Sequence, residues 1–223
     1  MARVLVFDVI ETLLDLRPLR DPFVRAFGDP APLGEWFARL LHGSLVATVT
    51  DTYEDFGAIG RRTLDGVASR LGHDLPEEDR EAILGTMGRL PPHPEVLGVL
   101  ERLRSAGFPL ATLTNSSGRM VSTQLDHAGL AGFFDLRLSV EEVRRYKPAP
   151  EPYLMAADRL GVEPSEMRMV AAHDWDVLGA MRAGCGAAFV ARGDVPFALG
   201  EPPDIVGPDL SAVGEAILRA DQP

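Results

Sequence analysis

The chain is built from short apolar runs that alternate with helical patterns, and this alternation restricts the possible folds most. Residues 4–7 (VLVF) form one such run, which ends at Asp8. A run this short, without polar alternation, is typical of a central strand buried on both faces of a parallel sheet. Similar runs predict further strands at 109–114, 134–138, 167–171 and 187–191.

Helical patterns separate these runs, and most of them stop just before a glycine. Glycine tolerates the left-handed backbone that commonly ends a helix, so each pattern has a physical stop signal. Strands that alternate with helices indicate an α/β fold with a doubly wound parallel sheet. The predicted helices of this layer cover 95–106, 118–128, 151–160 and the stretch from Trp175 to Gly184.

Residues 16–90 break this rhythm, because they contain several helical patterns and no convincing strand. One helical face is apolar at Leu33, Trp36, Phe37, Leu40 and Leu41. The same kind of pattern recurs at 53–71 and 76–89. We therefore predict a core of residues 1–15 and 91–223, and a helical cap of residues 16–90 inserted after the first strand, over the carboxyl edge of the sheet.

Composition and charge exclude several classes of protein. The 223 residues (24.1 kDa) are 46% hydrophobic and 25% charged, as in ordinary folded domains. The net charge of −11 disfavours nucleic acid and anionic membranes as partners, but it allows a locally basic pocket for a small anion. No apolar run reaches the ~18 residues of a membrane span, and the apolar start is too short for a signal peptide. The single cysteine, Cys185, excludes a disulfide framework, and we expect a cytoplasmic protein.

Polar side chains follow the predicted strands at their carboxyl ends, where doubly wound sheets bind their ligands. These residues are Asp8, then Thr114 and Asn115, then Lys147 and Tyr153, then His173, Trp175 and Asp176. Together they suggest nucleophilic catalysis by Asp8, since a carboxylate held against carbon or phosphorus can form a covalent intermediate. Thr114 and the helix after it would bind an anion. Taken singly, each residue also has an ordinary explanation, such as capping a helix.

Four motifs in this order, FDVIETLLD, TLTNS, YKPAPEPY and HDWD, resemble the haloacid dehalogenase superfamily over most of the chain, and within it the L-2-haloacid dehalogenases. The resemblance implies a Rossmann-like core with a helical cap. It also implies that Asp8 attacks C2 of a haloacid and forms an ester with inversion. The other roles it implies are Thr12 supporting Asp8, Lys147 beside it, Tyr153 after that lysine as a substrate-binding residue, Thr114 on the substrate carboxylate, Asn115 and Arg39 at the halide, Trp175 as a pocket aromatic, and Asp176 placing the hydrolytic water.

Position 10 separates two reactions of this superfamily. Phosphatase members carry a second aspartate two residues after the nucleophile, where an acid can protonate the leaving alkoxide, but this chain has Ile10. Halide is a very weak base and leaves without a proton, so Ile10 suits an apolar wall of the substrate pocket. We therefore predict metal-independent hydrolysis of short L-2-haloacids to 2-hydroxy acids and halide, with no cofactor.

The chain departs from the family's pattern near the nucleophile. Glu11 stands where glycine is common, and Ala171 and His173 stand where serine and asparagine are usual. The last two positions touch the water-activating network, so the details of ester hydrolysis stay open. His173 could serve as a hydrogen-bonding partner, as a base titrating near neutral pH, or only to orient Asp176.

Three other functions stay open at this point. The same aspartate chemistry would serve another small carboxylate attacked at saturated carbon, such as a fluoroacid or a strained-ring amino acid. A magnesium-dependent phosphatase would use Asp8, Asp174 and Asp176 as oxygen ligands for its cation, and only then is a metal expected. A non-catalytic binding protein would keep the fold after drift at positions 171 and 173. The apolar cap helices could also serve a homodimer, which the family commonly forms.

Overall fold

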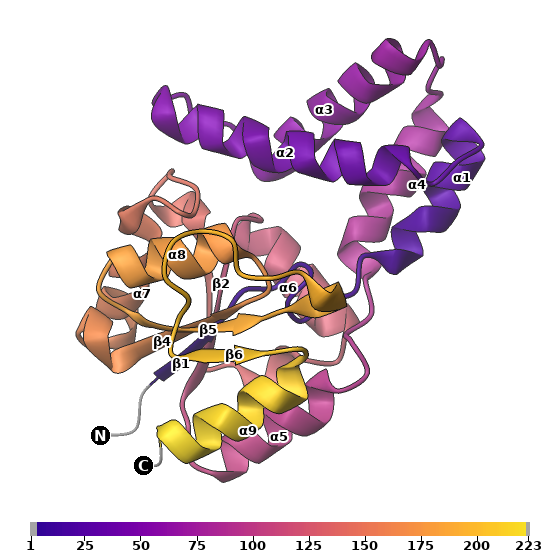
Figure 1. Ribbon diagram of the computed structural model, residues 1–223. Coiled ribbons are helices and arrows are strands. Elements are labelled where there is room, and N and C mark those ends of the chain that lie inside the picture. The colour runs from indigo at the N-terminus through magenta and orange to yellow at the C-terminus, as the bar shows by residue number, and fades with distance from the viewer. Residues whose placement is uncertain (1–3, 222–223) are drawn as a thin grey trace.

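Six parallel strands form one sheet in the computed structural model, which describes residues 4–221. Figure 1 shows how this sheet lies among the helices. Their order is β3-β2-β1-β4-β5-β6, and every neighbouring pair is parallel. The chain thus builds outward from β1 in one direction and then in the other, which confirms the predicted doubly wound fold class. The strands are β1 (Val4–Phe7), β2 (Leu110–Thr114), β3 (Leu136–Ser139), β4 (Met167–Ala171), β5 (Gly186–Val190) and β6 (Ile205–Gly207).

Five helices flank this sheet: α5 (Val96–Ser105), α6 (Gly118–His127), α7 (Pro150–Leu160), α8 (Asp174–Arg182) and α9 (Leu210–Ala220). They cover both faces because side chains alternate along each strand. In β1, Leu5 and Phe7 pack into one apolar cluster with α5, α6 and α9, whereas Val4 and Val6 pack into another with α7 and α8. A sheet buried on both faces explains the continuous apolar runs in the sequence.

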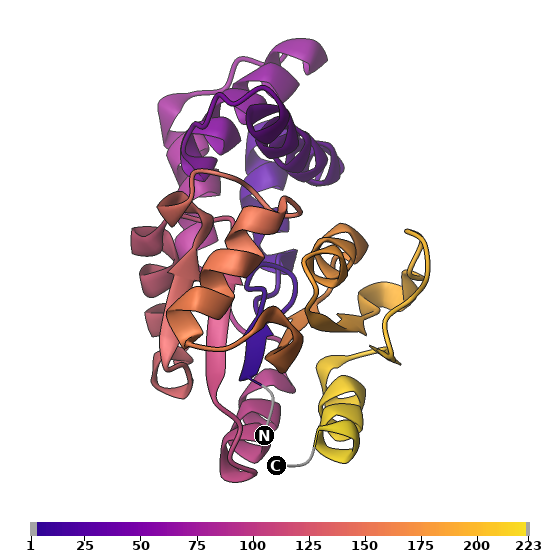
Figure 2. The same cartoon turned by 90° about the vertical axis from the view of Figure 1, so that its left-hand side faces the viewer.

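Four further helices follow β1: α1 (Arg20–Phe27), α2 (Pro32–Val49), α3 (Phe56–Leu71) and α4 (Glu77–Thr86). Figures 1 and 2 show them as a separate layer above the sheet. Trp36 of α2 donates from Nε1 to the carbonyl oxygen of Gly60 in α3 at 2.9 Å, which joins the two longest of these helices. The helical character of this segment agrees with the sequence pattern, while the domain limits at 16 and 90 stay a prediction.

The sequence pattern does not predict β6, because this strand lies at the sheet edge and is very short. Val206 at its centre is 50% exposed, so the strand lacks the apolar run that marks the central strands. No helix within residues 4–221 is long and apolar enough to cross a bilayer. Residues 1–3, which belong to the start judged too short for a signal peptide, lie outside the described residues.

Candidate active site

The site lies at the carboxyl ends of β1 and β4, two adjacent strands at which the sheet changes its direction of winding. Asp8 directly follows β1 and is 5% exposed, and its backbone N–H donates to the carbonyl oxygen of Val170 in β4 at 3.0 Å. His173 directly precedes α8, and Asp176 lies in its first turn. Parallel strands end side by side, so residues far apart in the sequence meet here.

Lys147 is the only lysine in the 223 residues, and its side chain is fully buried between two carboxylates. Its Nζ lies 2.9 Å from Asp8 Oδ1, 2.6 Å from Asp176 Oδ2 and 2.8 Å from the carbonyl oxygen of Leu113. Three N–H groups thus meet three acceptors, an arrangement that a planar guanidinium could not reproduce. Burial lowers the pKa of Lys147, but Asp176 and Asp8 outweigh it and raise the pKa above its ordinary value, so the ammonium stays charged.

Asp8 is held as a carboxylate despite its burial. Burial alone would raise the pKa of Asp8, but the positive charges of Lys147 and His173 hold it well below its usual range. Thr12 Oγ1 donates to Asp8 Oδ2 at 2.8 Å and accepts from the Ala172 backbone N–H at 2.9 Å, which fixes the carboxylate in place. At neutral pH the site therefore presents an ionised carboxylate in a fixed orientation, which is what nucleophilic attack by an oxygen would require.

The burial of the sole lysine predicts a distinctive acylation pattern. In the folded protein, an amine-selective acylating reagent should leave Lys147 unmodified, because its side chain has no exposed surface. As the urea concentration rises, acylation of Lys147 should appear with the same midpoint as global unfolding, because only unfolding separates this side chain from its carboxylate partners. Peptide mass spectrometry measures the acylated fraction of Lys147, and acylated Lys147 in the native protein would contradict this arrangement.

Asp176 is fully buried, and donors already occupy both of its carboxylate oxygens. Oδ2 accepts from Lys147, and Oδ1 accepts from the Tyr153 hydroxyl at 2.7 Å. Burial outweighs the lysine and raises the pKa of Asp176. Tyr153 is buried and does not border the cavity beside Asp8, so it positions Asp176 and is not placed to touch a substrate, which corrects the expectation. A Cβ on Gly179 would lie 2.7 Å from the Tyr153 hydroxyl, so this close approach requires glycine.

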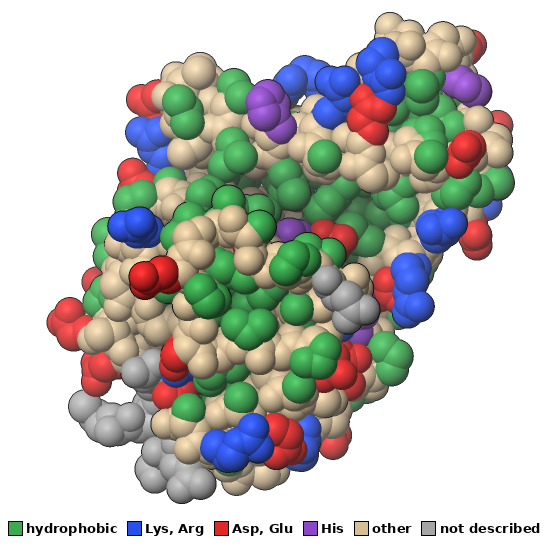
Figure 3. All heavy atoms as spheres, in the orientation of Figure 1, with side chains coloured by type: hydrophobic (Ala, Val, Ile, Leu, Met, Phe, Trp, Pro, Cys, Tyr) green, Lys and Arg blue, Asp and Glu red, His purple; other side chains and the backbone are tan. Residues whose placement is uncertain are grey.

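A small cavity beside Asp8 lies between the ends of the strands and the helices α2 and α3. Its volume of about 20 Å³ holds one water, so neighbouring side chains must separate further to admit a larger ligand. Figure 3 shows a hydrophobic hollow between the upper helices and the sheet layer. The cavity walls are mostly apolar, and the residues are Asp8, Ile10, Phe37, Leu41, Phe56, Thr114, Asn115, His173 and Trp175.

Thr114 and Asn115 each keep a donor for an anion in this cavity. Thr114 Oγ1 accepts from the Ser116 backbone N–H at 3.1 Å, which leaves its own hydroxyl hydrogen to donate. Asn115 Oδ1 accepts from the Lys147 backbone N–H at 3.1 Å, which leaves the amide NH₂ group to donate. A hydroxyl and an amide beside a buried ammonium suit a small anion, although the whole chain carries a net charge of −11.

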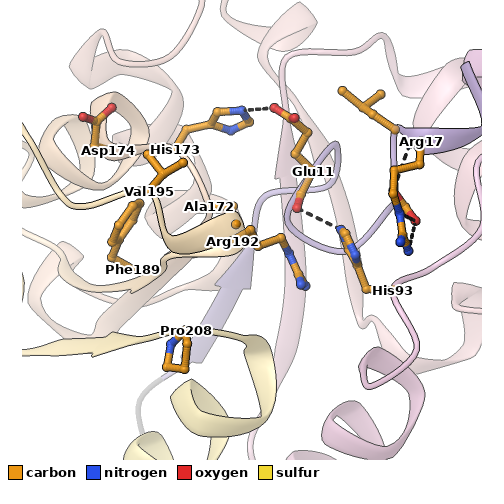
Figure 4. Close-up of a pocket in the computed structure, with 13 residues that line it drawn as sticks. Glu11, Arg17, His93, Ala172, His173, Asp174, Phe189, Arg192, Val195 and Pro208 are labelled. Atoms are coloured by element: carbon orange, nitrogen blue, oxygen red, sulfur yellow. Dashed lines mark hydrogen bonds and ion pairs between the residues drawn. The ribbon is translucent and has the colours of Figure 1, made fainter. Parts of the chain in front are cut away.

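His173 lies between two acidic side chains at the same cavity. Figure 4 shows its bond to Glu11: Nε2 is 2.8 Å from Glu11 Oε2, while Nδ1 is 3.5 Å from Asp8 Oδ2. The rings of Trp175 and Phe37 flank the imidazole, with centroids at 5.0 and 6.3 Å. Burial lowers the pKa of His173, but Asp8 and Glu11 outweigh it and raise the pKa to about 10. In the resting protein His173 is therefore an imidazolium and not, as one expectation had it, a base titrating near neutral pH.

Glu11 holds this position in a left-handed backbone conformation, with φ of 65°. A non-glycine residue pays roughly 1 kcal/mol or more for such a conformation, which explains why glycine suits this position. The strained residue lies between two histidines, since its carbonyl oxygen is 3.2 Å from His93 Nε2 (Figure 4). The sequence marks Glu11 as unusual, and the structure shows that its carboxylate contacts His173.

Arg39 lies on the outer face of α2, which corrects the expectation that it faces the cleft. Its Nε donates to Glu35 Oε1 at 2.7 Å, and its side chain is 51% exposed. Successive helix positions turn by about 100°, so Arg39 lies about 200° around the helix from Phe37. Phe37 and Leu41, one turn apart, border the cavity in its place. The cavity wall contributed by α2 is therefore aromatic and aliphatic.

The acidic groups at the strand ends do not fit a magnesium ion. The ammonium of Lys147 fills the space between Asp8 and Asp176, and Asp174 Oδ1 accepts from the Trp175 backbone N–H at 2.8 Å. Among residues 4–221, no group of three or more His, Cys, Asp or Glu side chains is arranged to hold a metal.

A protein-family model described as haloacid dehalogenase-like hydrolase matches residues 2–184. The chain belongs to this family. A curated relative, (S)-2-haloacid dehalogenase 1 of Pseudomonas sp. (strain CBS-3), is 31% identical to this hydrolase over 87% of the chain and 86% of the relative. A phosphoglycolate phosphatase of Vibrio parahaemolyticus is 29% identical over 96% of both chains, so both reaction types occur among the relatives.

The solved structures of relatives agree with this assignment. The L-2-haloacid dehalogenase from Xanthobacter autotrophicus with chloropropionic acid covalently bound matches this hydrolase with a TM-score of 0.89 and 27% identity, over 99% of each chain. The predicted superfamily and its α/β fold are thereby confirmed, and so is the resemblance to the L-2-haloacid dehalogenases.

Proposed function

We propose that this hydrolase cleaves the carbon–halogen bond of short L-2-haloacids and produces 2-hydroxy acids without a metal ion. The observation that carries this proposal is the ionised, oriented Asp8 carboxylate at a small apolar cavity that also contains donors for one anion. Ile10, at 6% exposure, lines this cavity and has no proton to give. A leaving phosphate ester oxygen would need that proton, whereas a halide does not.

In the first step, a carboxylate oxygen of Asp8 attacks C2 of the substrate. The carbon–halogen bond breaks as the carbon–oxygen bond forms, so the halide leaves with the electron pair and C2 inverts. Thr114 and Asn115 would bind the substrate carboxylate or the leaving halide through their remaining donors. The apolar residues around the cavity would strip water from the nucleophile, which strengthens its electrostatic interactions.

In the second step, water adds to the side-chain carbonyl carbon of Asp8. The bond from this carbon to the Asp8 oxygen that is now attached to C2 then breaks, so this oxygen leaves with the 2-hydroxy acid, and an oxygen from water restores the carboxylate. Overall, one haloacid and one water give one hydroxy acid, one halide and one proton. Lys147 would keep the restored Asp8 ionised for the next cycle.

Chloride release from L-2-chloropropionate and monochloroacetate, with EDTA present, tests this function. We expect one D-lactate per chloride from L-2-chloropropionate, and no reaction with its D enantiomer. Absence of chloride release above an Asp8→Asn control would refute the proposal. Hydrolysis of p-nitrophenyl phosphate that requires magnesium would favour a phosphatase, and turnover of fluoroacetate alone would favour the fluoroacid alternative.

A further inference from the structure

His173 Nδ1 is a buried polar atom beside the nucleophile that has no hydrogen-bond partner among the described residues. The other charged groups beside Asp8 are less suited to act as a base. Lys147 uses all three of its donors and has no lone pair, and Asp176 is fully buried and lines none of the cavities next to Asp8 or His173. A neutral His173 would keep a lone pair on Nδ1, which lies 3.5 Å from Asp8 Oδ2.

Glu11 fixes which nitrogen of His173 faces the reaction. Its carboxylate only accepts, so Nε2 must carry the hydrogen of the 2.8 Å bond between them. In a neutral ring, the lone pair then resides on Nδ1, on the side of Asp8. A histidine whose far nitrogen donates to a carboxylate, and whose near nitrogen faces the reacting group, is arranged as a general base.

We propose that His173 is the base that activates water for hydrolysis of the Asp8 ester, and that Glu11 is the residue that positions it. The inference rests on the proposed function, because it requires that ester to form. It adds a catalytic group for the second step, and it assigns a role to the departure from glycine at position 11.

Alkylation of Asp8 supplies the charge change that this role needs. In the resting protein, Asp8 and Glu11 both favour the imidazolium and raise the pKa of His173 to about 10. Ester formation removes the negative charge of Asp8, which is one of the two charges that raise the pKa of His173. Burial of the ring, which lowers this pKa, stays the same, so the pKa of His173 falls when the ester forms. The rings facing His173 from α2 and α8 are uncharged. Other charged or titratable groups bordering the adjoining hollows are unchanged by the step: Asp15, Arg17, Arg20, His93, Asp174 and Arg192.

The protons balance over the cycle. After the halide leaves, the imidazolium of His173 releases one proton to solvent. The neutral ring then takes a proton from the attacking water as the new bond forms at the carbonyl carbon of Asp8. Cleavage of the ester bond expels the hydroxy acid as an alkoxide, which takes the proton of the newly formed carboxylic acid. Asp8 ends as a carboxylate and His173 as an imidazolium, which is the resting state.

The structure also gives water and protons a path to this histidine. His173 borders the small cavity. Together with Glu11 it also borders two larger open hollows, of about 680 and 570 Å³. His173 therefore lies between the enclosed Asp8 carboxylate and open hollows that are large enough to hold water. Its side chain is 14% exposed, which is enough for contact with water on the outer side.

The test separates the two half-reactions in the full chain, with monochloroacetate in excess. Rapid-quench chloride measurement follows the first step, and intact-protein mass spectrometry follows the carboxymethyl ester. The wild type should release chloride continuously with little ester present. His173→Gln should release one equivalent of chloride, accumulate the ester on Asp8, and then turn over about 10²- to 10⁴-fold more slowly.

Variants of Glu11 test its positioning role. Glu11→Gln should slow ester hydrolysis while chloride release stays fast. In single turnovers the hydrolysis rate rises with pH as His173 loses its proton, and this rise should shift to lower pH without the Glu11 charge. Glu11→Gly should show the same kinetic defect without loss of thermal stability, because glycine suits the left-handed backbone. Asp51→Gly is the matched control, since Asp51 has φ of 57° on an exposed turn, and it should leave both steps unchanged.

Steady turnover by His173→Gln without ester accumulation would overturn the proposal. Equal slowing of chloride release and ester hydrolysis would also overturn it, because that is the result expected if His173 only binds the substrate anion. Failure of the wild type to release chloride from any haloacid would refute the proposed function itself. This outcome differs from failure of the His173 proposal alone, because neither half-reaction would then occur.

Discussion

Replacing Asp8 by asparagine is expected to lower kcat for chloride release from L-2-chloropropionate by at least about 10⁴-fold, because an amide is not a competent nucleophile at saturated carbon. The two side chains have the same shape, and Lys147 keeps Asp176 as its partner, so the fold should persist by circular dichroism. Asp158→Asn, at an exposed position on α7, is the matched control and should retain the wild-type kcat. An Asp8→Asn variant within tenfold of wild type would contradict the assigned nucleophile.

Replacing Lys147 by methionine is expected to lower the free energy of unfolding by about 3–5 kcal/mol at pH 7, because it leaves two buried carboxylates without a counter-charge. Urea denaturation measures this change. Arg159→Met breaks an exposed ion pair with Glu142 and should cost less than about 1 kcal/mol. A similar small loss for both variants would show that Lys147 does not balance the charges of Asp8 and Asp176.

The destabilisation by Lys147→Met should also diminish as pH falls. In the wild type the pKa of Asp8 is held below its ordinary value of 3.8, so its contribution to stability is present above that pH and is lost below it. Without Lys147, burial raises the pKa of both carboxyls, so the variant is most stable in acid and loses stability as pH rises through the raised values. The difference in unfolding free energy should therefore be smaller at pH 5 than at pH 7.

The core of the fold follows from the sequence because central parallel strands and glycine-stopped helices leave strong local patterns. The run at 4–7 is β1, and the helix predicted at 118–128 is α6, Gly118–His127. Edge strand β6 leaves no such pattern, since one side of it faces solvent. The convergence of Asp8, Lys147 and Asp176 was also predictable, because strand order and strand ends together determine which loops meet.

Tertiary placement of single side chains was not predictable from the same patterns. A helical stripe indicates that Phe37 and Leu41 are buried, but it does not show that they face a cavity. The expectation that Arg39 faces the cleft came from the motif resemblance, and the stripe could not exclude it. A lysine before proline looks solvated, and only the folded chain shows three acceptors around Lys147. Glu11 could be marked as unusual, but its contact with His173 depends on a left-handed backbone that the sequence does not specify.

In the proposed reaction Asp8 forms an ester, and water opens this ester at the side-chain carbonyl carbon. A single turnover in heavy-oxygen water, with enzyme in excess over L-2-chloropropionate, tests both steps. We expect peptide mass spectrometry to find the heavy oxygen in the Asp8 carboxylate, and the lactate product to carry ordinary oxygen. Heavy oxygen in the lactate with an unlabelled Asp8 would refute the ester, because water would then have attacked the substrate directly.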